Sequence, residues 1–276
     1  MGKRLLSETF EVSACRLDRL LPTEPAEAVS EVAGRLLRMT IQALLLDLDD
    51  TLVDHRGAAD RGLRTWLAGL GLADDPAELE GHVERWFVLE ARHYERAQRR
   101  ELTYAEQRRV RIRAFLPGWD LADDALADDV FAGFLGCYQA AWRAFDDAAA
   151  TLARAVDAGL PVGILTNGDH DIQTEKLRRT GLLRADVPVL ASSRLPAAKP
   201  DPRSYLTACA RLGADPARTL MVGDSLRHDV VGARQAGLQA RLLDRHGRYD
   251  ARRAPEGVLR VRGLAELDWA SSPARR

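Results

Sequence analysis

The sequence predicts an α/β protein with a Rossmann-like, doubly wound parallel sheet, into which an all-helical segment is inserted. Short, nearly continuous apolar runs, typical of strands buried on both faces, alternate with helical patterns in the second half of the 276-residue chain. Between the first run, at 41–46, and the second, at 162–165, a long stretch has helical periodicity throughout. Repeated βα units with short connections build a parallel sheet, so the helical stretch is expected to be an insertion into it.

The first 38 residues precede the first strand and have no clear period. Met39 stands two residues before that strand and is a candidate natural start, which would make 1–38 an extension outside the folded domain. The alternative is an additional helix over 25–38 that packs on the core. The sequence favours neither interpretation over the other.

The segment 58–142 is expected to form an all-helical domain. Its first helix has apolar residues at i, i+3 and i+4 (Leu63, Trp66 and Leu67) and ends near Gly71, a residue suited to terminate a helix. A capping box, in which Thr103 is followed three residues later by Glu106, predicts the start of another. The other two helices are expected at about 76–99 and 124–142.

Residues 39–57 and 143–268 are expected to form the sheet domain, with the residues after about 269 frayed. After the first strand, further strands are expected at 162–165, 187–191, 219–222 and 239–243, with 258–261 as another candidate. Each helix of this part is followed by a glycine, which favours a helix end there. These helices are expected at 146–158, 172–180, 202–212 and 230–236.

Composition excludes several classes of function. The 40 basic and 41 acidic residues nearly cancel, which gives no electrostatic reason to expect a nucleic-acid or membrane partner. No apolar run has the length of a membrane span, and no apolar leader segment is visible. The three cysteines are widely spaced and form no CxxC pair, which is typical of a reducing compartment. We therefore expect a cytoplasmic protein without nucleic-acid or membrane partners; its oligomeric state is not indicated.

Polar residues follow four of the expected strands. Ligands bind beyond the carboxyl ends of the strands in open parallel sheets, so these residues are expected to converge. They are Asp47 and Asp49 after the first strand, Thr166, Asn167 and Gly168 after the second, Lys199 after the third, and Asp224 and Asp229 after the fourth.

The chemistry of this set favours phosphoryl transfer. Several carboxylates repel one another, and a hard divalent cation such as Mg²⁺ relieves that repulsion in an oxygen-lined site. An ammonium group beside them provides a point charge for an anionic substrate. The chain has three lysines, and Lys199 alone follows a sheet strand within the cluster, whereas Lys3 lies in the N-terminal segment and Lys176 on an expected helix. A carboxylate nucleophile, a metal and an ammonium together indicate phosphoryl chemistry.

These residues also carry a resemblance to a family. The chain from about 39 to 250 resembles the haloacid dehalogenase (HAD) superfamily, in the branch with a helical cap inserted after the first motif. Four motifs occur in order: DLDDT at 47–51, the pair Thr166-Asn167, Lys199 in KPDP, and GDSLRHD at 223–229. One such motif is weak, but four at strand ends and in order are specific. Within that branch the chain is similar to phosphoglycolate phosphatase-like and N-acylneuraminate-9-phosphatase-like members.

The resemblance implies catalytic and substrate-binding roles. Asp47 would be the nucleophile that forms an aspartyl-phosphate. Asp49 would be the general acid toward the leaving group and then the base for the hydrolytic water. Thr166 would donate a hydrogen bond to the phosphoryl oxygens, with the backbone of Asn167 and Gly168 nearby as substrate-binding groups.

The resemblance also implies a metal site. Mg²⁺ would lie between Asp47, the backbone carbonyl of Asp49 and Asp224. Asp229 would bind it through water or orient the site, although this residue has an alternative as the N-cap of the next helix. Lys199 would offset the charge on Asp47 and the phosphoryl group. Phosphoryl transfer requires such positioning and charge stabilisation more than covalent machinery.

Other polar residues have simpler interpretations. Asp50 and Asp169 are expected to form turns or N-caps. The histidines show no metal-ligand spacing and are interpreted as surface or satisfied polar residues: His55, His93, His170, His228 and His246. The helical segment is rich in arginine, and each arginine is by itself expected on a solvated helix face. One or two of them are nevertheless candidates to contact a substrate carboxylate or a second phosphate. The arginines are Arg92, Arg96, Arg99, Arg100, Arg108, Arg109, Arg111 and Arg113.

The leading hypothesis is an enzyme, a Mg²⁺-dependent phosphoric monoester hydrolase that acts on a small phosphorylated metabolite. Family dehalogenases lack the second Asp of the first motif, which is present here as Asp49. Family phosphonatases use a cap lysine, and 58–142 contains none. A phosphosugar mutase of the same fold is the alternative, and a catalytically silent binding protein is less favoured because every motif residue is present. Phosphoglycolate, phosphosugars and nucleoside monophosphates all stay open as substrates.

Overall fold

The computed structural model describes residues 41–249 and 258–269. The expectations for the N-terminal segment, namely a start at Met39 or a helix over 25–38, lie outside the described residues. So does the expected fraying of the residues after 269.

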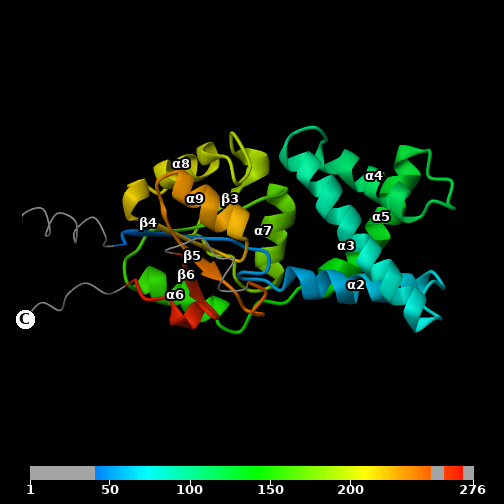
Figure 1. Ribbon diagram of the computed structural model, residues 1–276, viewed down its shortest axis with the longest axis horizontal. Coiled ribbons are helices and arrows are strands. Elements are labelled where there is room, and N and C mark those ends of the chain that lie inside the picture. Colours follow the sequence, from blue (N-terminus) through cyan, green and yellow to red (C-terminus); the bar gives the residue numbers. More distant parts are fainter. Residues whose placement is uncertain (1–40, 250–257, 270–276) are drawn as a thin grey trace, which may run out of the picture. The chain divides into compact units, whose positions relative to one another are not determined.

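The described residues form a six-stranded sheet in which every pairing is parallel, in the order β3-β2-β1-β4-β5-β6 (Figure 1). Central strand β1 pairs with β2 on one side and with β4 on the other, so that Leu44 lies between Val162 and Leu220. The strands are β1 (Ala43–Leu46), β2 (Val162–Thr166), β3 (Val189–Ala191), β4 (Thr219–Gly223), β5 (Gln239–Leu243) and β6 (Leu259–Val261). All six expected strands are confirmed, including the candidate at 258–261.

Alternate side chains of the strands bury on opposite faces of the sheet. Leu44 and Leu46 pack in one apolar cluster, which also takes in α6 (Ala148–Asp157) and α7 (His170–Arg179). Leu45 packs in a different cluster with α8 (Pro202–Arg211) and α9 (Gly232–Gln235). Figure 1 shows α6 on one side of the sheet and α8 with α9 on the other. The doubly wound architecture predicted from the sequence is therefore confirmed.

The strand order reverses between β1 and β4. From β1 the chain builds outward through β2 and β3, and then returns to the other side of β1 to build β4, β5 and β6. In open parallel sheets the loops on the two sides of such a reversal diverge and leave a crevice at the carboxyl ends of the strands. The loops after β1 and β4, which carry the acidic motif residues, flank this crevice.

Four helices lie between β1 and α6 and form an apolar cluster of their own. They are α2 (His55–Gly69), α3 (Pro76–Gln98), α4 (Tyr104–Phe115) and α5 (Asp124–Ala140), called the helical insert below. Trp66 and Trp86 lie at the centre of the cluster against Phe115, with ring centroids 6.2 and 5.0 Å from it. These tryptophans therefore pack the interior of the insert.

Local signals in the sequence set the ends of these helices. Gly71 follows α2 with a φ of +69°, a conformation that glycine adopts without strain. The capping box predicted for α4 is present, since Thr103 accepts from the Glu106 backbone and Glu106 accepts from the Thr103 backbone. Asp169 caps α7, as expected.

The helix predicted at 230–236 begins earlier in the structure. A π-helical turn, Leu226–Val231, precedes α9, and Ser225 is its N-cap. Within the described ranges there are also three short 3-10 helices, at Ser192–Arg194, Pro216–Arg218 and Leu264–Glu266. Among the helices in the described ranges, none combines the length and apolarity required to cross a membrane.

Candidate active site

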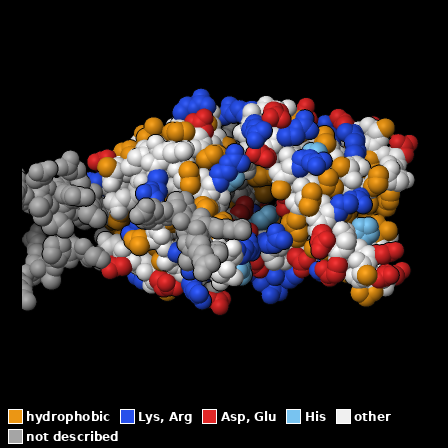
Figure 2. Space-filling model, viewed as in Figure 1, with side chains coloured by type: hydrophobic (Ala, Val, Ile, Leu, Met, Phe, Trp, Pro, Cys, Tyr) orange, Lys and Arg blue, Asp and Glu red, His pale blue; other side chains and the backbone are white. Residues whose placement is uncertain are grey.

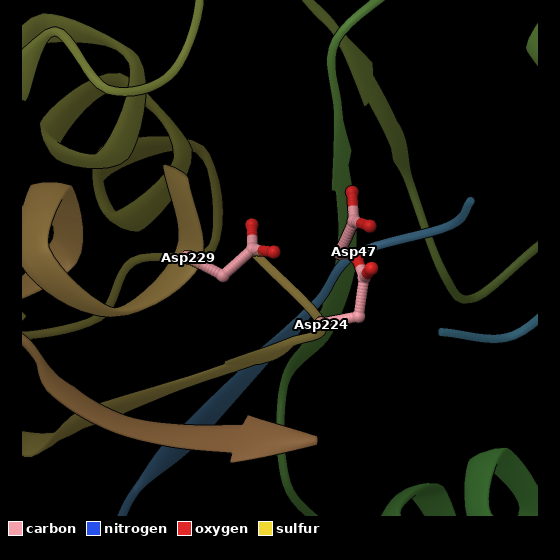
Figure 3. Close-up of side chains that lie close together, drawn as sticks. All are labelled: Asp47, Asp224 and Asp229. Carbon is pink, nitrogen blue, oxygen red and sulfur yellow. The ribbon is translucent and has the colours of Figure 1, made fainter. Parts of the chain in front are cut away.

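Three carboxylates meet at the crevice between β1 and β4. Asp47 follows β1, Asp224 follows β4, and Asp229 lies in the π-helical turn. Each offers an oxygen atom, and these oxygens all lie within 4.8 Å of one another. Figure 3 shows the Asp229 side chain directed from its helical turn toward the side chains of Asp47 and Asp224, which lie at the ends of adjacent strands. The convergence predicted from the sequence is present for these residues.

Lys199 lies beside this acidic cluster. Its Nζ is 2.6 Å from Asp47 Oδ1 and 2.6 Å from Asp229 Oδ1, and only 3% of the lysine is exposed. The amide of Asn167 holds the lysine's main chain, because it donates to the Lys199 carbonyl and accepts from the Lys199 N–H, both at 2.9 Å. The end of β2 thus positions the ammonium group at the end of β1.

The acidic cluster is short of positive charge. Burial, followed by repulsion from Asp229 and Asp49, raises the pKa of Asp47 to about 7, although Lys199 opposes this rise. Burial, and then repulsion from Asp47 and Asp229, raises the pKa of Asp224 to about 8. Carboxylate oxygens that repel one another around a common space are the donor set that a hard divalent cation prefers. The residues present therefore fit Mg²⁺, which adds the missing charge.

Asp49 lies in a separate ionic arrangement. Its carboxylate contacts the Lys176 ammonium and accepts a hydrogen bond of 2.9 Å from Gln173 Nε2. Burial by itself raises the pKa of Asp49, but Lys176, His55 and Gln173 outweigh it and lower the pKa to about 2. Asp47 and Asp49 thus have opposite pKa shifts, although only one residue separates them in the sequence.

The sequence interpretation missed Lys176. It sets this lysine aside as a helix residue, yet the side chain is 2% exposed and lies against the rings of Tyr138 and Trp142 as well as Asp49. The sequence does contain a signal that places Lys176 near the site. Helix α7 starts just after β2, so its first turns lie at the carboxyl edge of the sheet, and Gln173 and Lys176 are three residues apart on one helix face.

The polar residues after β2 already have partners within the protein. Thr166 is buried, and its hydroxyl accepts a hydrogen bond of 2.7 Å from Gln173. The Gly168 N–H donates to Ser192 Oγ at 2.9 Å, and its carbonyl accepts from Ser193 N at 3.1 Å. Gly168 therefore ties the end of β2 to the loop after β3.

Asp229 is not the N-cap of the next helix. Ser225 occupies that position, and Asp229 Oδ2 accepts from the Ser225 N–H at 3.0 Å while Oδ1 faces Lys199. A Cβ atom on Gly223 would come within 2.2 Å of this carboxylate, so only glycine leaves room for it. Asp50, by contrast, is a turn residue as expected, with a φ of +57° and a hydrogen bond from the Arg56 N–H.

The helical insert covers the crevice, and a cavity of about 510 Å³ lies between the two. Figure 2 shows the hollow on this face of the molecule, with acidic side chains visible inside it. Tyr94 donates to the Asn167 carbonyl, and the Tyr104 hydroxyl pairs with Ser192 Oγ, both at 2.9 Å. Aromatic side chains from α3 and α4 therefore contact the loops that follow β2 and β3.

Arg111 of the insert differs from expectation, whereas His55 is a satisfied polar residue, as expected. Arg111 is 4% exposed and pairs with Glu90 at 2.6 Å, so it is a buried cavity residue, whereas a solvated helix face was predicted. His55 also lines the cavity, where Nδ1 is 2.6 Å from the Tyr138 hydroxyl and Nε2 is 3.8 Å from Glu90. Burial lowers the pKa of His55, but Tyr138, Asp49 and Glu90 more than compensate and raise it well above 6.5.

Comparison with known proteins identifies the class to which this fold and site belong. Residues 41–237 match the family described as haloacid dehalogenase-like hydrolase. The match spans most of the chain, and the protein therefore belongs to this hydrolase family, as the four motifs predict.

Individual relatives carry phosphatase names. A phosphoserine phosphatase of Thermus thermophilus is 41% identical over 129 residues, which are 46% of this chain and about half (51%) of the relative. A glyceraldehyde 3-phosphate phosphatase of Methanopyrus kandleri is 29% identical over 76% of this chain and 86% of its own. A phosphoglycolate phosphatase of Neisseria gonorrhoeae is 29% identical over 71% of this chain and 77% of its own.

Solved structures share the fold. The HAD-hydrolase YfnB of Bacillus subtilis has a TM-score of 0.66 at 22% identity, covering 82% of this chain and 96% of that one. A 2-haloacid dehalogenase of Pseudomonas syringae has a TM-score of 0.58 at 29% identity, covering 82% of this chain and 95% of that one. The fold is thus found with both phosphatase and dehalogenase names, and the site residues must distinguish between these activities.

Proposed function

We propose that the protein is a Mg²⁺-dependent phosphatase that hydrolyses a small phosphomonoester through an aspartyl-phosphate on Asp47. The observation that carries this proposal is the pair of lysine–aspartate contacts: Lys199 holds Asp47 beside the acidic cluster, and Lys176 holds Asp49 apart from it. The phosphatase names of the relatives support it. A dehalogenase has no leaving oxygen that must be protonated, so it has no need of Asp49.

In the first half-reaction, a carboxylate oxygen of Asp47 attacks phosphorus. The phosphorus–oxygen bond of the ester breaks, and the departing oxygen takes a proton from Asp49. Because this carboxylate is ionised in the free protein, that proton arrives with the ester in its monoanionic form, since the second pKa of a phosphomonoester is about 6. Lys199 offsets negative charge on Asp47 and on the transferred group, and the Thr166 hydroxyl donates to a phosphoryl oxygen. The backbone groups of Asn167 and Gly168 shape the same pocket.

In the second half-reaction, Asp49 takes a proton from water, and the water oxygen attacks phosphorus. The bond to Asp47 breaks, which releases inorganic phosphate and restores the carboxylate. Lys176 keeps Asp49 ionised in the free protein, and the ionised form is the base that this step requires. Gln173 fixes the orientation of the same carboxylate.

Mg²⁺ would be held by Asp47, Asp224 and Asp229, together with the backbone carbonyl of Asp49. It would neutralise the charge that accumulates on the phosphoryl oxygens. The sequence-based division, with 58–142 as a cap on a core of 39–57 and 143–268, fits this proposal. The contacts of Tyr94 and Tyr104 with the sheet loops would close the cavity and exclude bulk water. The cytoplasmic location expected from the sequence stays a prediction.

The test is hydrolysis of p-nitrophenyl phosphate with and without Mg²⁺. We expect turnover with Mg²⁺, and Asp47→Asn is expected to lower it by at least about 10³-fold because the amide is not a nucleophile. Asp50→Asn is the matched control, since Asp50 lies in the same loop and acts in the turn. Parallel assays with a 2-haloacid and with sugar phosphates test the dehalogenase and mutase alternatives. The proposal fails if no phosphate is released from this ester or from a panel of phosphorylated metabolites.

A further inference from the structure

One face of α4 lines the cavity opposite the acidic cluster. Tyr104, Gln107, Arg108 and Arg111 are spaced i, i+3, i+4 and i+7, which places them on one side of the helix. All four line the same cavity as Asp47. The tyrosine at the start of this face is anchored to the sheet loops through Ser192, so the face is held over the site.

Arg108 differs from its neighbours on the helix. Arg109 pairs in bidentate fashion with Asp128 at 2.6 and 2.8 Å, and Arg111 pairs with Glu90. In the part of the chain that the structure describes, no carboxylate lies within 4 Å of the Arg108 guanidinium. Among carboxylates, Asp169 raises the pKa of Arg108 most by its charge, but this carboxylate already caps α7.

Arg108 is also partly withdrawn from water. It is half-buried, with its guanidinium carbon 5.9 Å from the centre of the Phe131 ring, and burial lowers its pKa. A desolvated cation without a counter-ion is unfavourable, and an anionic ligand removes that penalty. Arg56 lines the cavity too and lacks a carboxylate partner among the described residues, but it is exposed and lies over Phe87, where water solvates it.

Gln107 provides a second, independent observation. It is 2% exposed, and its Nε2 donates to the Tyr104 carbonyl at 3.2 Å. Its Oε1 is buried and has no hydrogen-bond partner. A buried acceptor without a donor is uncommon in folded proteins, and a donor on a ligand is one way to satisfy it. The face therefore presents an unmatched cation beside an unmatched acceptor.

From this pairing we propose that Arg108 and Gln107 form the leaving-group subsite, and that the enzyme prefers phosphomonoesters whose leaving group carries a carboxylate next to a hydroxyl or amino group. The inference rests on the proposed phosphatase activity. A carboxylate accepts two parallel hydrogen bonds from a guanidinium, and the adjacent hydroxyl or amino group donates to Gln107 Oε1.

The surroundings of Arg108 favour a carboxylate on the leaving group over a second phosphate or a nucleobase. A second phosphate carries about two negative charges, and Glu90 and Glu95, which also line the cavity, would repel it more strongly than a single charge. A nucleobase requires a free aromatic face, but Phe131 and Phe134 pack against Trp86 within the insert. A compact hydroxy- or amino-acid leaving group satisfies the face without these conflicts.

The experiment compares esters that differ only in the carboxylate. The pairs are 3-phosphoglycerate with glycerol 3-phosphate, and O-phosphoserine with phosphoethanolamine. We expect kcat/KM to be about 10- to 100-fold higher for the carboxylate member of at least one pair, as for one charge-assisted bidentate contact. Arg108→Gln is expected to abolish this ratio by raising KM for the carboxylate member, and Arg108→Lys is expected to give an intermediate ratio.

Arg109→Gln is the matched control, because Arg109 is the next residue, pairs with Asp128, and does not line the cavity. It is expected to leave the ratio intact. The proposal is overturned if the wild-type protein treats both members of each pair alike. It is equally overturned if Arg108→Gln lowers both members by the same factor, or if Arg56→Gln removes the preference and Arg108→Gln does not.

Binding separates failure of the subsite from failure of the proposed function. Calorimetric titration of the Asp47→Asn protein with each ester measures recognition without turnover. The subsite is supported, whatever the activity, if the Asp47→Asn protein binds the carboxylate member more tightly. This difference in affinity should disappear in the double variant that carries both Asp47→Asn and Arg108→Gln. Equal binding of the two members overturns the subsite, even if p-nitrophenyl phosphate is hydrolysed and the phosphatase proposal stands.

Discussion

The carboxyl edge of the sheet and the inner face of the helical insert handle charge differently. At the sheet edge, Lys199 is shared between Asp47 and Asp229, and Lys176 lies against Asp49. On the insert, Arg108 has no carboxylate within 4 Å among the described residues. The groups proposed to react are thus already paired with protein partners before a ligand arrives, whereas the proposed recognition group Arg108 has no carboxylate partner until a ligand supplies one. Charge changes at the sheet edge should therefore alter turnover of every ester, and changes on the insert should alter the choice of ester.

The largest effect is expected from Lys199→Arg. The lysine is buried, with both of its carboxylate partners at 2.6 Å, and the broader, forked guanidinium does not fit a site built for a compact charge. We expect kcat to fall by about 100-fold or more for all esters. Arg203→Lys, the reverse exchange at an exposed ion pair, serves as control and should change little. Near-normal turnover of Lys199→Arg would show that the point-charge role is wrong.

A smaller effect, with a distinct pH signature, is expected from Lys176→Met. Without the ammonium, burial and the remaining like charges leave the pKa of Asp49 above its present value of about 2. We expect kcat to fall by about 10-fold or more below about pH 6, because hydrolysis of the aspartyl-phosphate requires ionised Asp49, and we expect the acid limb of the pH–kcat profile to move to higher pH. Glu175→Gln, on the adjacent, partly exposed residue, should leave both unchanged. An unshifted acid limb in Lys176→Met would mean that Lys176 does not control Asp49.

Mg²⁺ should stabilise the protein more at high pH than at low pH. The folded-state pKa values of Asp47 and Asp224 are about 7 and about 8, above the ordinary value of 3.8. Between pH 3.8 and these values, the two carboxyl groups bind more protons in the folded protein than in the unfolded chain. Ionisation of these groups therefore lowers stability as pH rises through that window, and Mg²⁺ offsets the loss. Thermal unfolding should show a larger Mg²⁺-induced rise in Tm at about pH 8.5 than at about pH 6. Asp224→Asn should reduce this difference, and an equal rise at both pH values would contradict the metal assignment.

The smallest effect is expected from Thr103→Ala, which removes half of the capping box of α4. We expect a loss of about 1 kcal/mol in the free energy of unfolding, measured by urea denaturation. The ratio of kcat/KM between carboxylate and non-carboxylate esters should not change, because the Arg108 face is intact in the folded state. A changed ratio would show that helix stability, and not Arg108 chemistry, sets the preference.

The fold and the acidic cluster could be predicted because their signals are local. A strand buried on both faces reads as an apolar run, as at Leu44–Leu46, and a glycine such as Gly71 marks a helix end. The residues after each strand then converge by topology alone, which places Asp47 beside Asp224. No knowledge of tertiary packing is required for either step.

The residues that were missed depend on how helices pack. Lys176 reaches Asp49 because α7 turns one particular face toward the crevice. His55 and Arg111 line the cavity because α2 and α4 dock over the sheet edge. A run of arginines along α4 gives no indication of which one faces inward until the partner surface is known, so Arg108 and Arg109 could not be distinguished from the sequence.

The most direct test of the proposed chemistry is chemical trapping of the intermediate at Asp47. The protein is mixed with Mg²⁺ and a turned-over phosphomonoester, quenched during turnover, and reduced with borohydride, which converts an aspartyl-phosphate into homoserine. Peptide mass spectrometry should then find homoserine at position 47, dependent on the ester and absent from Asp47→Asn. Steady turnover with Asp47 unmodified, or with the modification at another carboxylate, would contradict the assignment of Asp47 as the nucleophile.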